Sequence, residues 1–230
     1  MMSRPVTLFT GQWADLPFAV LCEKAARFGY DGLEICTWGD HMDVRKAAVD
    51  PDYVAERKEI LARYKLGCWA LGAHLAGQCV ASLYDPRYDG FVPAEHRGSQ
   101  EKMRAWAIQE MKDTAKAAKN MGCPVVTGFV GSPVWNYWYS FPQTTQGQID
   151  AAFVQVASLW NPILDVFDQC GVCFALEVHP TEIAFDYYSS EKLLKAFEYR
   201  KTFGFNFDPS HLIWQGVNPA LFLRDFKDRI

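Results

Sequence analysis

The sequence predicts an α/β fold with a single parallel sheet that curves into a barrel. Strand-like runs alternate six times with helix-like runs along the 230 residues, which is the pattern of a parallel sheet. At least four of the strands carry one apolar face and one face of small residues that ends in a polar group. No glycine-rich phosphate-binding fingerprint follows the first strand. The first observation gives the fold class, and the other two favour a barrel over a doubly wound sheet.

Glycine and proline mark the ends of several expected elements. Pro17 lies near the start of the first helix and Gly29 follows its last residue, as helices prefer. Ser99 is expected to cap a longer helix that stops at Gly122. Pro162 lies inside the helix 148–170 and is expected to kink or split it. The expected strands are 6–10, 31–36, 67–74, 125–130, 172–179 and 203–208. The expected helices are 18–28, 52–64, 100–121, 148–170, 190–199 and 219–230.

The last two strands show the alternation most clearly, because successive side chains of a strand point to opposite faces. Phe203, Phe205 and Phe207 form an apolar face that we expect to lie outward, under helices. The opposite faces hold small residues first and polar residues last, namely Cys173, Ala175, Glu177 and His179 in one strand and Gly204, Asn206 and Asp208 in the other. The same alternation in the strand 67–74 places Trp69 and Leu71 opposite Cys68, Ala70, Gly72 and His74.

Strand faces of this kind separate the two architectures that alternating strands and helices allow. In a doubly wound sheet both faces lie under helices and are apolar throughout. In a barrel the inner face is crowded, and the strand ends form the site. We therefore expect an α/β fold of the (β/α)8 TIM-barrel type, with about six βα units present, as a single domain over residues 1–230.

Polar side chains gather where the fifth and sixth strands end. Glu177 and His179 share one face of their strand, Asp208 ends the next strand, and His211 follows three residues later. Two carboxylates and two imidazoles at neighbouring strand ends suit a divalent metal ion. The alternative is a hydrogen-bonded polar strand end with a helix cap. We prefer the metal site because charged groups at such positions are rarely buried without a partner.

Composition and charge fit a compact chain without a nucleic-acid or membrane partner. Half of the residues are apolar and the net charge is −4, so the chain has no basic footprint for nucleic acid. No apolar run is long enough to cross a bilayer, and no signal-peptide pattern opens the chain. Seven cysteines, mostly in apolar stretches, indicate reduced thiols and a cytoplasmic location. Cys170 and Cys173 have CxxC spacing but lie between a helix end and a strand, which favours a structural role.

Four segments together resemble the sugar phosphate isomerase/epimerase family, which belongs to the xylose isomerase-like TIM barrels. They are GYDGLEI at 29–35, the strand that ends in His74, FALEVHP at 174–180 and NFDPSHLIWQG at 206–216. The resemblance covers the length of the chain, and the pair LEVHP and FDPSHL is specific. It implies a divalent metal ion (Mn, Mg, Co or Zn) held by Glu177 and Asp208, with two further ligands expected from strands seven and eight.

The resemblance also implies a reaction, the isomerisation or epimerisation of a sugar or sugar phosphate by proton transfer beside a metal-bound carbonyl. The metal ion stabilises the enediolate, and Glu177 serves both as a ligand and as the acid/base group. His211 and His74 are expected to contact substrate hydroxyl groups, and Glu182 falls near a position that contacts substrate in relatives. The alternative for His74 is a core histidine whose hydrogen bonds are satisfied locally.

Four further positions are weaker substrate-binding candidates. His179 shares the face of Glu177, although the following proline also suits a simple turn. Glu34, on the small-residue face of strand two, either orients a neighbour or binds substrate. Trp135 and Trp138 lie in the segment 131–147, which like the segment 76–98 is long enough to be a lid over a sugar ring. The alternative is that the aromatic side chains of these segments pack on each other or on another subunit.

The chain ends at Ile230, where the resemblance places the seventh strand and its histidine. Relative to the family it is expected to be C-terminally truncated and to lack the last two βα units. Two alternatives to the isomerase stay open, a metal-dependent abasic-site endonuclease of the same barrel fold and an inactive remnant that binds metal or sugar. The endonucleases carry an additional histidine at the end of strand four, which the run 125–130 lacks. A homo-oligomer is a further alternative, because an incomplete barrel leaves open sheet edges.

We expect the 230-residue chain alone to bind Mn²⁺ weakly and to show little isomerase activity. Two carboxylate ligands leave most of the coordination sphere to water, whereas a hard divalent cation is normally held by more protein or substrate oxygens. Calorimetric titration of Mn²⁺, with assays on a panel of ketoses and their phosphates, checks this expectation. Submicromolar binding together with ordinary turnover by a monomer would contradict it.

Overall fold

Six short strands form one parallel sheet in the order β1-β2-β3-β4-β5-β6. The protein is described by a computed structural model, which covers residues 4–135 and 140–230. The strands are β1 (Thr7–Phe9), β2 (Gly32–Cys36), β3 (Gly67–Gly72), β4 (Val125–Gly128), β5 (Cys173–Glu177) and β6 (Phe203–Asn206). Each strand pairs with the next one along the chain, without the reversal of order that a doubly wound sheet shows. The predicted α/β fold with consecutive parallel strands of the barrel type is therefore confirmed.

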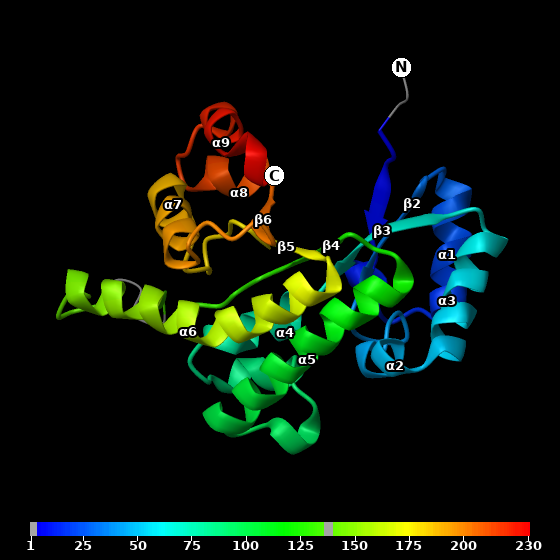
Figure 1. The fold of residues 1–230 in the computed structure, drawn as a ribbon, viewed down its shortest axis with the longest axis horizontal. Coiled ribbons are helices and arrows are strands. Elements are labelled where there is room, and N and C mark those ends of the chain that lie inside the picture. The colour runs from blue at the N-terminus through cyan, green and yellow to red at the C-terminus, as the bar shows by residue number, and fades with distance from the viewer. Residues whose placement is uncertain (1–3, 136–139) are drawn as a thin grey trace.

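Helices follow each strand and lie on the outer side of the sheet. In Figure 1, α1, α2 and α3 lie at the end of the sheet that holds β1, whereas α7, α8 and α9 lie beside β6 at the other end. The helices of the described chain are α1 (Phe18–Phe28), α2 (Val44–Val49), α3 (Pro51–Arg63), α4 (His74–Ala81), α5 (Gln100–Met121), α6 (Gln146–Cys170), α7 (Tyr187–Ala196), α8 (Pro209–Trp214) and α9 (Pro219–Phe226). Short 3₁₀ turns are η1 (Thr10–Trp13), η2 (Pro86–Gly90), η3 (Ala94–His96) and η5 (Lys227–Arg229).

Local signals in the sequence set several helix ends. Gly29 and Gly122 adopt φ angles of 86° and 82° directly after α1 and α5, a backbone conformation that glycine adopts at little cost. The side chain of Ser99 accepts a hydrogen bond from the backbone of Lys102, which confirms the predicted cap of α5. The predicted split at Pro162 is wrong, because α6 runs without a break from Gln146 to Cys170. Fully buried side chains on both sides of Pro162, namely Trp160, Ile163 and Leu164, hold the two halves of α6 against the core.

The outward face of the sheet carries the core. Phe174 pairs with Phe203 and Leu176 with Phe205, and all four side chains are at most 2% exposed. Phe205 in turn packs edge-on against Phe226 of α9, with 5.4 Å between the ring centroids. The predicted outward direction of Phe203 and Phe205 is therefore confirmed. Large apolar side chains lie between sheet and helices, and the small residues of the alternate positions are left for the inner face.

A β-bulge in β3 reverses the faces that the sequence predicts for two residues. Cys68 pairs with the outward Leu33 and Ala70 with the inward Glu34, so Trp69 is the extra residue between them. A Cβ atom added to Gly32 would lie 2.5 Å from the Trp69 ring, which places this ring over the inner face of β2. The prediction that Trp69 faces outward and Cys68 inward is therefore wrong, because the bulge resets the alternation of the strand.

The chain between β3 and α5 also differs from the prediction. The strand was expected to run to His74 and a loop to span 76–98, but β3 ends at Gly72 and His74 begins the helix α4. Six consecutive residues of α4, from Ala76 to Ala81, are buried. Gly77 makes the close packing possible, because a Cβ atom at this position would lie 2.1 Å from the carbonyl oxygen of Phe129. This helix therefore lies tightly against the end of β4.

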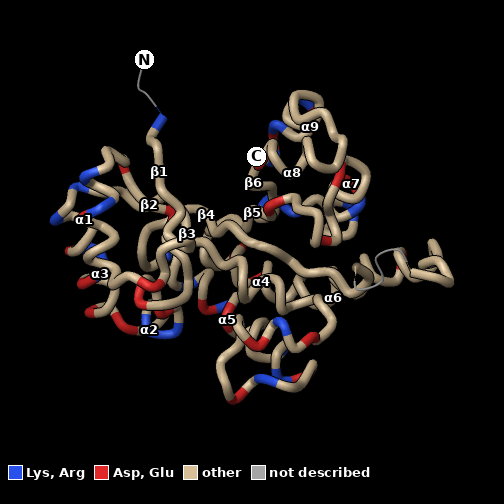
Figure 2. The backbone as a smooth tube through the Cα atoms, turned by 180° about the vertical axis from the view of Figure 1, so that it is seen from behind, with Lys and Arg blue, Asp and Glu red and all other residues tan. Residues whose placement is uncertain are grey.

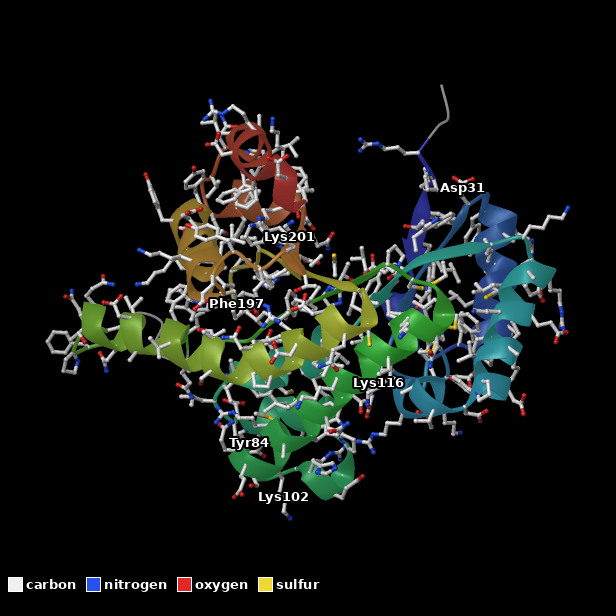
Figure 3. All side chains as sticks on the ribbon, viewed as in Figure 1. Asp31, Tyr84, Lys102, Lys116, Phe197 and Lys201 are labelled. Carbon is white, nitrogen blue, oxygen red and sulfur yellow. The ribbon has the colours of Figure 1, made fainter. Side chains whose placement is uncertain are left out.

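Charged side chains of both signs lie on the outer helices. Figure 2 shows lysine, arginine, aspartate and glutamate residues interspersed along α1, α3, α5 and α7. In Figure 3, Lys102 lies at the outer rim of α5, whereas Phe197, directly after α7, lies in the interior and is 1% exposed. Within residues 4–135 and 140–230, no helix combines the length and the apolar character needed to cross a membrane.

The close approach of α4 to β4 predicts that Gly77→Ala destabilises the protein. Alanine favours a helix interior by about 0.5–1 kcal/mol over glycine. The added methyl group, however, meets a backbone oxygen that cannot move without displacing the end of β4. We expect a net loss of about 1–3 kcal/mol in the free energy of unfolding, measured by urea denaturation. Gly90→Ala is the control, because nothing lies within 4 Å of an added Cβ atom there. Equal effects of the two substitutions would contradict the packing argument.

Candidate active site

The carboxylate of Glu177 lies at the centre of the polar groups at the strand ends. Glu177 is the last residue of β5, and its side chain is 16% exposed. Its Oε2 atom lies 3.3 Å from Nε2 of His74 and accepts a hydrogen bond of 3.2 Å from Nδ2 of Asn206. Its Oε1 atom lies 3.1 Å from Nε2 of His211. Side chains that follow β3 or belong to β6 and α8 therefore converge on one carboxylate of β5.

Asp208 and His211 join this carboxylate through the first turn of α8. Asp208 caps the helix, and its Oδ1 atom accepts hydrogen bonds of 2.7 Å and 2.6 Å from the backbone nitrogen and the hydroxyl group of Ser210. Its other oxygen, Oδ2, lies 3.6 Å from Nε2 of His211. One ligand atom from each of Glu177, Asp208 and His211 lies within 4.8 Å of the other two. The sequence placed His211 beside the two carboxylates and proposed the carboxylates as metal ligands, and in the structure the imidazole of His211 lies close enough to be a third ligand.

Neighbouring imidazoles influence the protonation of the two carboxylates. Burial by itself would raise the pKa of Glu177, but the hydrogen bond from His74 and the charges of His74 and His211 outweigh it and lower the pKa. For Asp208, burial is likewise outweighed, here by the hydrogen bonds from Ser210 and the charge of His211, so that its pKa is also lowered. Both carboxylates are therefore ionised at neutral pH, as a ligand for a cation must be.

A row of aromatic and imidazole rings surrounds Glu177. The ring of Phe129, which follows β4, lies 4.9 Å from that of His74 and 5.0 Å from that of His179. His179 in turn lies edge-on to His211, at 4.2 Å between centroids. On the other side, Phe9 of β1 lies 5.2 Å from His74. Burial and the charge of His211 lower the pKa of His179, which favours its neutral form. The structure thus places His74, His179 and His211 around one carboxylate.

Glu34 is a second carboxylate on the inner face of the sheet. It lies in β2, and its Oε1 atom accepts a hydrogen bond of 2.5 Å from the hydroxyl group of Thr127 in β4. Burial raises the pKa of Glu34, and the negative charge of Glu177 acts in the same direction, against the lowering by Thr127 and His74. The two inner carboxylates therefore have pKa values moved in opposite directions.

Glu182 does not join the cluster around Glu177. It is fully buried, and its Oε2 atom accepts hydrogen bonds of 2.7 Å from the backbone nitrogens of both Val130 and Gly131. Its backbone carbonyl oxygen accepts a hydrogen bond from the indole nitrogen of Trp135. Trp135, a predicted lid residue, therefore contacts the segment after β5, whereas Trp138 lies outside the described residues.

Sequence reasoning missed three residues that shape the site. Asn206 shares the inner face of β6 with Asp208 and donates to Glu177, and the alternation of the strand was the signal that could have identified it. Phe129 and Phe9 were missed because polar groups were sought at the strand ends, whereas these residues contribute rings that pack against His74. The imidazoles are thus held by aromatic neighbours as well as by hydrogen bonds.

A parallel α/β sheet of consecutive strands, with its polar cluster at the carboxyl ends of the strands, places this protein in the class of barrel-type α/β folds. A family model described as the xylose isomerase-like TIM barrel matches residues 22–230 of the chain. The chain belongs to this family.

Individual relatives agree with this assignment at low sequence identity. The uncharacterized protein YfiH of Bacillus subtilis (strain 168) is 25% identical over 228 residues, which cover 96% of this chain and 69% of YfiH. The structure of the 3-keto-D-glucoside 4-epimerase YcjR from E. coli has a TM-score of 0.70 at 12% identity, over 99% of this chain and 77% of YcjR. The structure of the IolI protein has a TM-score of 0.65 at 17% identity, over 99% of this chain and 70% of IolI. At these identities the two solved structures support the fold alone.

The burial of Glu182 predicts a pH dependence of stability. Burial raises its pKa to about 7 from an ordinary value of 4.5, against the lowering by the amides of Val130 and Gly131. Between these two pH values the folded chain binds more protons at this site than the unfolded chain, so the free energy of unfolding falls as the pH rises. Glu182→Gln removes this titration. We expect the difference in unfolding free energy between the protein and the variant to change by about 3 kcal/mol across this window.

Urea denaturation at several pH values between 4 and 8 measures this difference. Glu56→Gln is the matched control, because Glu56 is exposed on α3. The unfolding free energy of this variant should depend on pH in the same way as that of the unmodified protein. Parallel profiles for the Glu182 variant as well would show that this carboxyl group does not titrate in the expected window.

Proposed function

We propose that this chain belongs to a metal-dependent sugar or sugar phosphate isomerase or epimerase, which acts by proton transfer beside a metal-bound carbonyl. One observation carries the proposal: ligand atoms of Glu177, Asp208 and His211 lie within 4.8 Å of one another at the carboxyl ends of neighbouring strands. In barrels of this type that end of the sheet is where the active site lies. The donors come from a short segment of sheet and one helix turn, so their positions are fixed by the fold.

The donor set fits a divalent metal ion. Two carboxylate oxygens and one imidazole nitrogen are ligands that Mn, Co and Zn accept, and the carboxylates also suit Mg. Glu177, Asp208 and His211 would hold the ion, and Asn206 and His74 would orient Glu177 from behind, as supporting partners of a metal ligand do. A bound ion of this kind supplies stabilisation of negative charge on a carbonyl oxygen and its neighbour.

The residues of the chain supply the proton transfer. Glu177, ionised at neutral pH, accepts a proton from the carbon next to the carbonyl group, and Glu34, whose pKa is raised, is suited to donate one. His74 and His211 lie beside the same carboxylate, His74 as its orienting partner and His211 as a further ligand that would hold the ion. The rings of Phe129 and Phe9 provide apolar surface for the C–H face of a sugar.

The relatives support the same class of substrate. The YcjR structure is described as a 3-keto-D-glucoside 4-epimerase, and the IolI structure is described with a bound zinc atom. The abasic-site endonuclease is less well supported, because Phe129 follows β4 where such an enzyme would need a histidine. Acidic and basic residues are also interspersed along the outer helices of the described chain in Figure 2, rather than basic residues being gathered on one of them.

Free thiols support a reducing, cytoplasmic environment as part of this proposal. All seven cysteines are unpaired, and the sulfur atoms of Cys68 and Cys123 lie 3.2 Å apart without a bond between them.

Substitutions of Glu177 and Asn206 test the proposal, the first by removing a ligand and the second by removing a partner of that ligand. Glu177→Gln removes a ligand and the proposed base, and we expect Mn²⁺ binding to be lost and turnover of ketoses or their phosphates to fall by about 10²- to 10⁴-fold. Asn206→Ala removes only a partner of that ligand, and we expect a loss of about 10- to 100-fold in Mn²⁺ affinity. Calorimetry measures the affinity, and circular dichroism checks that the fold is intact.

Asn120→Ala is the control for the amide substitution, because Asn120 hydrogen-bonds to Ala47 and Ala48 on the outer side of the molecule. If Glu177→Gln retained the Mn²⁺ affinity and the turnover of the unmodified protein, the proposal would be wrong. The assays require a form of the protein that turns over one of the sugars, so a longer chain that includes residues 1–230 is tested in parallel.

A further inference from the structure

We propose that Glu182 is a positioning residue, whose buried carboxylate fixes the segment after β4 so that Phe129 holds His74 and His179 beside Glu177. This inference rests on the proposed function in treating these histidines as part of the active site. It departs from the expectation that Glu182 touches the substrate.

The side chain of Glu182 holds the backbone of the segment after β4. Glu182 lies between β5 and α7, and its side chain crosses to a segment 51 and 52 residues earlier in the chain. There its Oε2 atom accepts hydrogen bonds from two consecutive backbone nitrogens, those of Val130 and Gly131. The carbonyl oxygen of Val130 is in turn bonded to the indole nitrogen of Trp160 in α6, at 3.0 Å. Both polar groups of the Val130 backbone are thus fixed by buried side chains from two different elements.

The same segment also contacts α4. Gly131 has a φ angle of 78°, and a Cβ atom added to it would lie 2.4 Å from the carbonyl oxygen of Gln78. The next residue, Ser132, donates a backbone hydrogen bond to the hydroxyl oxygen of Ser82, which also accepts one from Gln78. The anchored segment is therefore pressed against the C-terminal part of α4, the helix whose first residue is His74.

The segment held by Glu182 also carries the aromatic ring that packs against two imidazoles. Phe129 directly precedes the anchored Val130, and its ring lies against both His74 and His179. Its carbonyl oxygen faces Gly77 in α4, so that the backbone of Phe129 has no room to shift toward that helix. The backbone nitrogen of Glu182 also donates to the carbonyl oxygen of His179, at 2.9 Å. One residue therefore connects the chain after β4 with the chain after β5, on either side of the Phe129 ring.

Burial argues against direct contact of Glu182 with a substrate. The side chain is 0% exposed, although the sheet of the described residues has free edges at β1 and β6. One carboxylate oxygen is used by the two amides, and the side chain of Gln78 lies beside the carboxyl group and lowers its pKa, so that protein groups surround it. Burying a carboxylate costs free energy, and the hydrogen bonds from the two amides offset part of that cost.

Glu182→Ala tests the inference by leaving the two amides without an acceptor. We expect hydrogen exchange in peptides that cover 128–135 to become about 10- to 100-fold faster, because the segment opens locally. We also expect the proton NMR signals of His74 and His179 to lose the ring-current shift caused by Phe129, while the signals of His41 and His96 stay in place. Glu182→Gln, which keeps one oxygen acceptor, is expected to restore both signals and slow exchange.

Glu56→Ala on the exposed side of α3 is the control for the loss of a carboxylate. Unchanged exchange over 128–135 in Glu182→Ala, or histidine signals at their original positions, would overturn the inference. Loss of turnover with exchange and NMR signals unchanged would also overturn it, since that result indicates substrate contact. If Glu182→Ala does not fold, Glu182→Gln and Gly131→Ala are compared, and the inference requires that only the glycine substitution displaces the two histidine signals.

The hydrogen-exchange and NMR measurements need neither metal nor substrate. Failure of the proposed function, seen as absence of Mn²⁺ binding and turnover by a longer chain that includes residues 1–230, therefore leaves the test of Glu182 readable.

Discussion

The site depends on the compensation of one partly buried negative charge. The carboxylate of Glu177 loses much of its hydration at the end of β5, and an isolated ion in that position is strongly disfavoured. His74, Asn206 and His211 offset this cost from three directions. These three residues come from different parts of the sheet edge. The charge is therefore tolerated only when the carboxyl ends of β3, β5 and β6 are aligned with one another. The pairing of Glu177 with Asn206 in the register of β5 and β6 provides part of that match.

The apolar outer face of the sheet makes this alignment rigid. Phe174, Phe203 and Phe205 are buried under α6, α7 and α9, and their packing leaves no freedom to slide a strand by one residue. A slip of that kind would turn Asn206 outward and bring a phenylalanine to Glu177. The apolar residues of the outer face are thus also the reason why the polar ends of the strands stay in register.

Much of the fold was accessible from the sequence because it follows simple periodicity. The alternation of Phe203, Gly204, Phe205 and Asn206 assigned the two faces of β6, and glycines after α1 and α5 marked helix ends. The helix α4 was missed because nearly all its residues are buried, so it lacks the polar stripe by which a surface helix is recognised. The bulge in β3 was missed because one extra residue leaves the composition of the strand unchanged while reversing its faces.

The candidate site divides in the same way. Glu177, Asp208 and His211 belong to two short motifs, and their proximity follows from adjacent strands that end on one side. The partners of Glu182 are backbone amides of a segment about fifty residues away, and no side-chain pattern records such a contact. Its position near a substrate-contacting residue of relatives was visible, but the direction of its side chain depends on how two loops pack.

The bulge in β3 also shows how the base of the inner face is filled. The Trp69 ring occupies space that side chains at Gly32 and Gly67 would otherwise take, since Cβ atoms there would lie 2.5 Å and 2.3 Å from it. One large side chain and two absent ones thus form a single volume-conserving unit, spread over two strands. A methyl group at 67 therefore requires a smaller residue 69 or loss of the bulge, whereas one at 32 would also meet the backbone carbonyl oxygen of Gly67 at 2.3 Å, so a smaller residue 69 alone would not make room for it.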